Sequence, residues 1–231
     1  MKLLKMFVGF GLLFPAVVST QVLWDILLAA RTNIDVLFPL PAVALLSGAL
    51  AWVLLFALFS RPLRSYILAH ELTHALWGML MGARVSRIQV KADHGSVVLS
   101  KTNFLITLAP YFFPFYAVFV ILVYFALSLF YDLRPYALWW LGAVGFTWAF
   151  HVTFTINALL QRQTDIQQQG RIFSYAFIYL ANVLGICIWV VWVTTPEWQD
   201  LTGYLMLRTS VAWRILEDGV VSLREMLRPH L

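Results

Sequence analysis

Long apolar runs dominate the chain and predict membrane-spanning helices. The first segment, Met1 to Leu23, starts with Lys2 and Lys5 and continues as an apolar run, and we expect it to form an uncleaved first helix. A signal peptide is the alternative, because Val17 and Ser19 suit a small-residue cleavage site. Three further runs are each long enough to cross a bilayer, and they cover residues 42–59, 136–160 and 172–193.

One more apolar run, residues 103–129, is interrupted by Pro110 and Pro114. Proline breaks or kinks a helix, so we expect a short segment followed by a full span from about Phe115. With the motif-bearing helix described below, the pattern predicts an all-α polytopic membrane protein with about six transmembrane helices. The mixed charged and apolar segment Leu205–Leu227 predicts an amphipathic helix at the membrane surface.

The longest polar segment before the C-terminal tail, Arg84–Lys101, predicts a small β-hairpin. Ile88 and Val90 alternate with polar residues, residues 93–95 have the composition of a turn, and residues 96–100 can form a second strand. An irregular loop is the alternative. A shorter polar link after the first helix is expected to hold Asp25, Arg31 and Asp35.

The composition agrees with this pattern. The chain is 61% apolar and only 12% charged, whereas soluble domains carry about a quarter charged residues. The mean hydropathy is +0.81, which leaves little room for a separate soluble domain. The net charge of +5 is spread over loops that face lipid headgroups, so we expect no nucleic-acid partner. The single cysteine, Cys187, excludes an internal disulfide and a thiolate zinc cage.

One stretch, His70-Glu71-Leu72-Thr73-His74, is polar within an otherwise apolar helix expected over residues 65–81 and closed by Gly82. Helix positions i and i+4 share a face, so the two imidazoles can bind one zinc ion and Glu71 can act as the general base. Ionisable groups are costly in such a setting, which favours a function for them. A helix that merely carries a polar face is the alternative.

A catalytic zinc ion usually has three protein ligands and one open position. The residues themselves leave the third ligand open among Asp93, His94, Asp132, His151 and Asp165. We expect His151 to be a buried histidine bonded to a neighbouring helix and His94 to belong to the hairpin turn, so neither enters the expected ligand set.

The segment His70–Ala75, with Gly82 eight residues after the second histidine, resembles the active-site helix of the site-2 protease family of intramembrane zinc metalloproteases. In that family a later helix carries an asparagine that is followed, eight residues on, by an aspartate. Asn157 and Asp165 have this spacing. The family's prolines are missing here, and Ile166 stands where the family has a glycine. The hairpin is similar to the membrane-associated β-loop of this family.

The resemblance implies a Zn²⁺ cofactor held by His70, His74 and Asp165, and it implies that Asn157 lies near the substrate carbonyl or the oxyanion. Zinc would lower the pKa of its water to about 7 and polarise the scissile carbonyl. Glu71 would take the water proton and pass it to the leaving amine. Because a helix bonds its own carbonyls, the substrate must unwind, and the hairpin edge can accept it as an added strand.

We expect three regions: N-terminal transmembrane helices over residues 1–60, a catalytic membrane core over 61–171, and a last span with the amphipathic helix over 172–231. The expected partners are the lipid bilayer, a membrane-protein substrate and a separate regulatory protein, since the length leaves no room for a regulatory domain. The expected location is a bacterial-type inner or plasma membrane, with the protein embedded as a multi-pass protein.

Two other functions compete with proteolysis. One is a non-catalytic, zinc-binding membrane scaffold. The other is a transporter, which is expected to place ionisable residues on several spans in two related halves, whereas here they gather on one helix and one later segment. The membrane orientation stays open, because basic loops fall on both sides almost equally.

Overall fold

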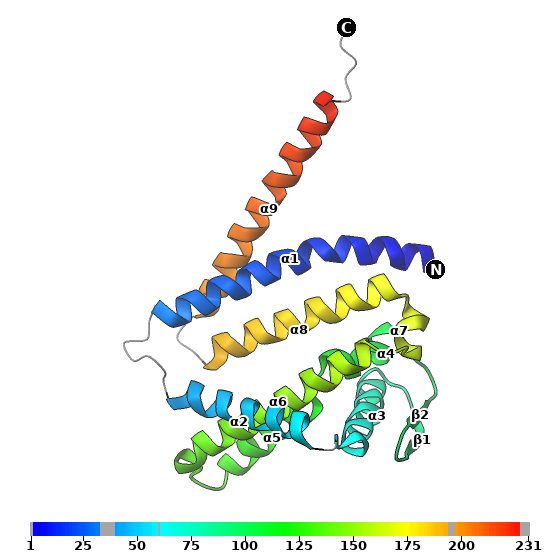
Figure 1. Cartoon of the computed structure of the whole chain (residues 1–231), viewed down its shortest axis with the longest axis vertical. Coiled ribbons are helices and arrows are strands. Elements are labelled where there is room, and N and C mark those ends of the chain that lie inside the picture. The colour runs from blue at the N-terminus through cyan, green and yellow to red at the C-terminus, as the bar shows by residue number, and fades with distance from the viewer. Residues whose placement is uncertain (1, 33–39, 60, 194–196, 227–231) are drawn as a thin grey trace. The chain divides into compact units, whose positions relative to one another are not determined.

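The structure is a computed structural model that describes residues 2–32, 40–59, 61–193 and 197–226. Within these ranges the chain is mostly helical, with one small antiparallel sheet (Figure 1). The helices are α1 (Lys2–Thr32), α2 (Leu40–Leu58), α3 (Leu63–Leu80), α4 (Phe104–Phe112), α5 (Phe115–Ser128), α6 (Ala137–Leu159), α7 (Thr164–Gln169), α8 (Arg171–Val193) and α9 (Trp198–Met226), and a short 3-10 turn covers Arg134–Tyr136. The strands are β1 (Val85–Val90) and β2 (Gly95–Leu99).

The chain divides into two compact units. One contains residues 1–35 and 175–231, and the other contains residues 36–174. Helix α2 is grouped with the core that carries the motif helix rather than with α1, and the expected functional division at residues 60 and 171 stays a prediction.

The multi-pass membrane character is confirmed at a coarse level. Among the described residues, four helices are long and apolar enough to cross a membrane: α1, α2, α6 and α8. The pair α4 and α5 passes the same test together, but the two are bent by 77° at a short break. The break is where Pro110 and Pro114 predicted it. The motif helix α3 is not among the four, because its basic, acidic and histidine side chains lower its mean hydropathy. The expected total of about six transmembrane helices therefore stays a prediction.

The first helix continues further than the sequence predicted. Asp25 and Arg31, expected in a polar link, lie inside α1, while Asp35 falls outside the described residues. An acidic side chain is tolerated there because Arg208 of α9 holds both Asp25 carboxylate oxygens at 2.6 Å. The helix α9 also starts earlier than expected, at Trp198 rather than Leu205.

Within the core unit, α2 and α6 touch backbone to backbone. A Cβ atom at Gly48 would overlap the carbonyl oxygen of Gly142, and one at Gly145 would overlap the carbonyl oxygen of Leu45. Small residues let helices in a membrane approach this closely. The glycines therefore allow α6 to pack directly against α2, and the C-terminal end of α6 leads into the segment that carries Asp165.

The motif helix α3 ends at a glycine and carries the hairpin on its surface. Gly82 adopts a φ of +72°, which a residue without a Cβ accepts freely and which turns the chain out of the helix. The predicted hairpin is confirmed: β1 and β2 pair antiparallel, with an irregularity between Val85 and Arg87. The side chain of Leu99 lies against Gly78, so β2 packs directly on α3 (Figure 1).

Candidate metal centre

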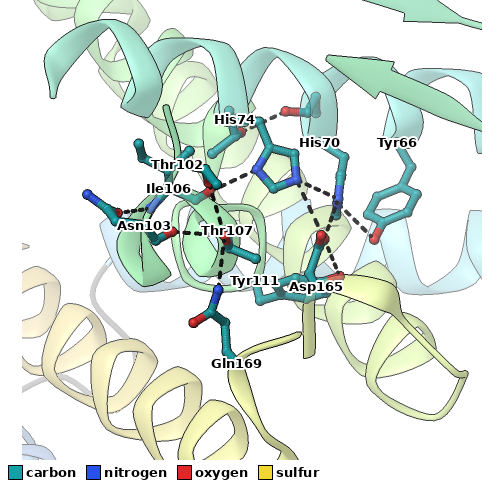
Figure 2. A network of polar contacts seen from close by, with 12 residues as sticks. Tyr66, His70, His74, Thr102, Asn103, Ile106, Thr107, Tyr111, Asp165 and Gln169 are labelled. Carbon is teal, nitrogen blue, oxygen red and sulfur yellow. Dashed lines mark hydrogen bonds and ion pairs between the residues drawn. The ribbon is translucent and has the colours of Figure 1, made fainter. Parts of the chain in front are cut away.

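Three side chains that the sequence singled out meet at one point. Helix α3 places His70 and His74 one turn apart on one face, and Asp165 reaches them from the first turn of α7 (Figure 2). The two Nε2 atoms lie 3.2 Å apart. Asp165 Oδ2 lies 3.4 Å from Nε2 of His70 and 3.5 Å from Nε2 of His74. Residues 95 positions apart in the sequence thus form one cluster.

The size of this triangle fits a tetrahedral metal ion. An ion bound at about 2.0–2.1 Å holds its ligand atoms about 3.3 Å apart. The three measured sides, 3.2, 3.4 and 3.5 Å, scatter around that value. Two imidazole nitrogens and one carboxylate oxygen are also a ligand set that zinc uses in catalytic sites, with a fourth position left for water.

Hydrogen bonds behind the cluster orient its members. His74 Nδ1–H donates to the carbonyl oxygen of Ile106 at 2.8 Å, so the lone pair of its Nε2 points toward the other two groups. The Tyr111 hydroxyl donates to Asp165 Oδ2 at 3.0 Å. The Tyr66 hydroxyl lies 3.4 Å from His70 Nδ1 and can accept its proton. With these tautomers the three acceptor atoms face one another, as in a group that could hold a metal ion.

Glu71 lies beneath the start of β2. It is a buried residue, 7% exposed. The strand passes so closely that a Cβ at Gly95 would lie 2.6 Å from Glu71 Cγ and 2.8 Å from its Oε1. Any larger residue at this position would therefore displace the strand or the side chains of Glu71 and Ile67.

A cleft of about 800 Å³ opens beside the cluster. Its lining includes both histidines of the motif, Glu71 and Asp165. The hairpin contributes β2, and the end of α6 with α7 contributes amide side chains; these are Asn157, Gln161, Gln163 and Gln168. The carboxylate proposed as a base and the cluster proposed to bind metal therefore face one space.

Asn157 lines this cleft, the position that the family resemblance implies, and its Oδ1 accepts a hydrogen bond from Arg61 Nη1 at 3.4 Å. Its amide nitrogen lies on the same side chain and can donate to a bound molecule. No structural observation tests a role in binding an oxyanion, so that role stays a prediction.

The other candidates for a third ligand are not members of this cluster, although Asp93 and His94 line the same cleft. His94 donates to Asp93 at 2.7 Å in the exposed hairpin turn, and this hydrogen bond lowers the pKa of Asp93 below its ordinary value. Asp132 accepts two hydrogen bonds from the Arg134 side chain, each at 2.9 Å, in the link after α5. His151 is buried within α6. In the described part of the chain, the group of histidine and carboxylate side chains close enough to hold an ion is His70, His74 and Asp165.

Comparison of the chain with protein-family models, with curated proteins and with solved structures found no match. The case for a function therefore rests on the residues and their geometry.

Four contributions to the site were not predicted from the sequence: the Ile106 carbonyl, the Tyr66 and Tyr111 hydroxyls and the glycine contact at Gly95. The free Ile106 carbonyl could have been predicted from Pro110, because a proline in a helix leaves the carbonyl four residues earlier without its usual N–H donor. Nothing in the local pattern pointed to Tyr111, since its partner is 54 residues away.

Proposed function

We propose that this protein is an intramembrane zinc metalloprotease that hydrolyses peptide bonds of membrane-embedded or membrane-adjacent substrates. The observation that carries the proposal is the triangle of donor atoms from His70, His74 and Asp165, which has the dimensions of a tetrahedral zinc site and shares a cleft with Glu71. The candidate spans support a membrane setting. The resemblance of the motif to the site-2 protease family points to the same reaction.

Zinc, when bound, supplies a Lewis acid that polarises the scissile carbonyl and lowers the pKa of water. His70 and His74 offer their Nε2 lone pairs, and Asp165 adds a negative charge. Glu71 accepts a proton from the attacking water and transfers it to the nitrogen of the leaving amine as the C–N bond breaks. The products are a carboxylate and an amine, so one water is consumed for each bond cleaved.

The free edge of β2 supports the binding of an extended peptide. The N–H of Ser100 and the carbonyl of His94 are both bonded to the β1 side of the hairpin. Main-chain groups alternate in direction along an antiparallel strand. Those of Gly95, Val97 and Leu99 therefore point to the other edge, and all three residues line the cleft. An unwound substrate can pair with this edge as an added strand.

Metal content tests the site. Zinc bound to the purified protein should be about one equivalent in the wild type and should be lost in His70→Ala, His74→Ala and Asp165→Ala. His94→Ala is the matched control, because this histidine lies in the exposed turn and pairs with Asp93. Wild-type protein that binds no zinc would contradict the proposal.

A second experiment separates catalysis from metal binding. Glu71→Gln should keep its zinc and lose cleavage, because an amide cannot accept the water proton. The measurement is a comparison of new peptide termini in membranes that contain the wild type or the Glu71→Gln variant. Termini within hydrophobic segments that depend on Glu71 support proteolysis. Identical termini with unchanged cellular function would support a scaffold instead.

A further inference from the structure

Pro110 leaves one carbonyl of α4 without its helical partner. In an α-helix the carbonyl of residue i accepts the N–H of residue i+4. For Ile106 that donor would be residue 110, which is a proline inside α4 and has no N–H. The proline ring also pushes the carbonyl of residue i−4 away from the helix axis.

The freed carbonyl is the one that His74 uses. Its oxygen accepts Nδ1–H of His74 at 2.8 Å in a buried contact. A buried carbonyl without a donor would cost about 1–3 kcal/mol, so the interaction is favourable for both groups. It also selects the tautomer in which Nε2 of His74 is free to bind a metal.

The rest of α4 holds this carbonyl in place. Asn103 caps the helix, and its Oδ1 accepts the backbone N–H of Ile106 at 2.9 Å. Tyr111, the residue after the proline, donates its hydroxyl to Asp165. Two residues of one short helix, Ile106 and Tyr111, thus hydrogen-bond to two of the three proposed ligands, His74 and Asp165 (Figure 2).

We propose that Pro110 is a positioning residue of the metal centre: by removing a helical N–H, it reserves the Ile106 carbonyl for His74 and sets the orientation of that imidazole. This inference rests on the proposed function. Replacement by alanine restores an N–H that competes with His74 for the same oxygen.

The test is Pro110→Ala in the full-length protein, with zinc affinity measured by competition with a chelator. Loss of a partner behind a metal-binding histidine typically weakens metal binding about 10–100-fold, and we expect a loss in that range. Alanine is a better helix former than proline, but the variant also loses part of a buried ring, so the thermal midpoint of the zinc-free variant should stay close to that of the wild type. A general structural defect would instead lower the midpoint.

NMR of protein with ¹⁵N-labelled histidine gives a direct readout. The Nδ1 proton of His74 should resonate downfield and exchange slowly in the wild type, and should shift upfield or exchange faster in Pro110→Ala. Pro15→Ala is the matched control, since it removes another proline inside a helix, α1. It should change neither the zinc affinity nor this signal.

The outcomes distinguish the two proposals. A wild type that binds no zinc, or a His74→Ala variant that binds it as well as the wild type, overturns the proposed function. Zinc that is lost in His74→Ala but held equally by the wild type and Pro110→Ala, with the His74 signal unchanged, overturns only the role of Pro110.

Discussion

Gly95→Ala is the sharpest test of the arrangement around Glu71. The new Cβ would lie 2.6 Å from both Glu71 Cγ and Ile67 Cγ2, and 2.8 Å from Glu71 Oε1. These distances are well below van der Waals contact, which is about 3.5–4.0 Å between carbon atoms. Both neighbours are buried and anchored on α3, so either β2 moves away from the helix or the Glu71 carboxylate leaves its position.

Inserting a methyl group into a packed site costs typically about 1–3 kcal/mol. If that strain is relieved by displacing Glu71 or the strand, the fraction of molecules in the original arrangement falls by roughly 5- to 150-fold. We therefore expect kcat to fall within that range. Gly95 has no positive φ, so the effect is steric and does not come from backbone strain.

The assay is hydrolysis of a transmembrane peptide by the protein reconstituted in lipid, with a peptide chosen because wild type cleaves it and Glu71→Gln does not. Zinc content should stay at the wild-type level, because the methyl group meets Glu71 and Ile67 rather than the ligands. Ser96→Ala, one residue along the same strand, is the control and should retain activity. A Gly95→Ala enzyme with the kcat of wild type would refute the close contact between β2 and the base.

Three further changes test other parts of the structure. Val97→Pro should abolish cleavage and leave the zinc content intact, because it removes an N–H on the free edge of β2 that a substrate strand needs. Val97→Ala keeps this N–H and should keep activity. Equal activity of the two variants would exclude strand addition. Tyr111→Phe should weaken zinc binding about tenfold or more, by removing the donor to Asp165, and an unchanged chelator titration would contradict that. Arg208→Met should lower the thermal midpoint of unfolding, because Asp25 is left unpaired inside α1. Adding Asp25→Leu should restore the midpoint, and failure to do so would argue against the ion pair.

Features set by near neighbours in the sequence could be predicted. The spacing of His70 and His74 follows from the helical repeat, the hairpin follows from alternation around residues 93–95, and the break between α4 and α5 follows from two prolines. In each of these cases the physical cause lies within one turn or one loop of its effect.

Features set by distant residues could not be predicted from the pattern alone. Asp25 looked like a loop residue because Arg208, which allows it inside α1, is 183 positions away. Asp165 was one of several candidate ligands until its spacing from Asn157 was compared with a family. The contact of Gly95 with Glu71 depends on how a strand lies on a helix, which composition does not encode.

The backbone contact between α2 and α6 determines which parts of the core can open. Because Gly48 and Gly145 leave no side chain between the two helices at these positions, the two backbones are in direct contact and a long chain cannot pass between them there without breaking that contact. Helix α6 ends at Leu159, only a few residues before Asp165. The short link between them restricts how far the Asp165 carboxylate can move from α6. Under the proposed function, we therefore expect a polypeptide substrate to enter where β2 forms a wall of the cleft, rather than between α2 and α6.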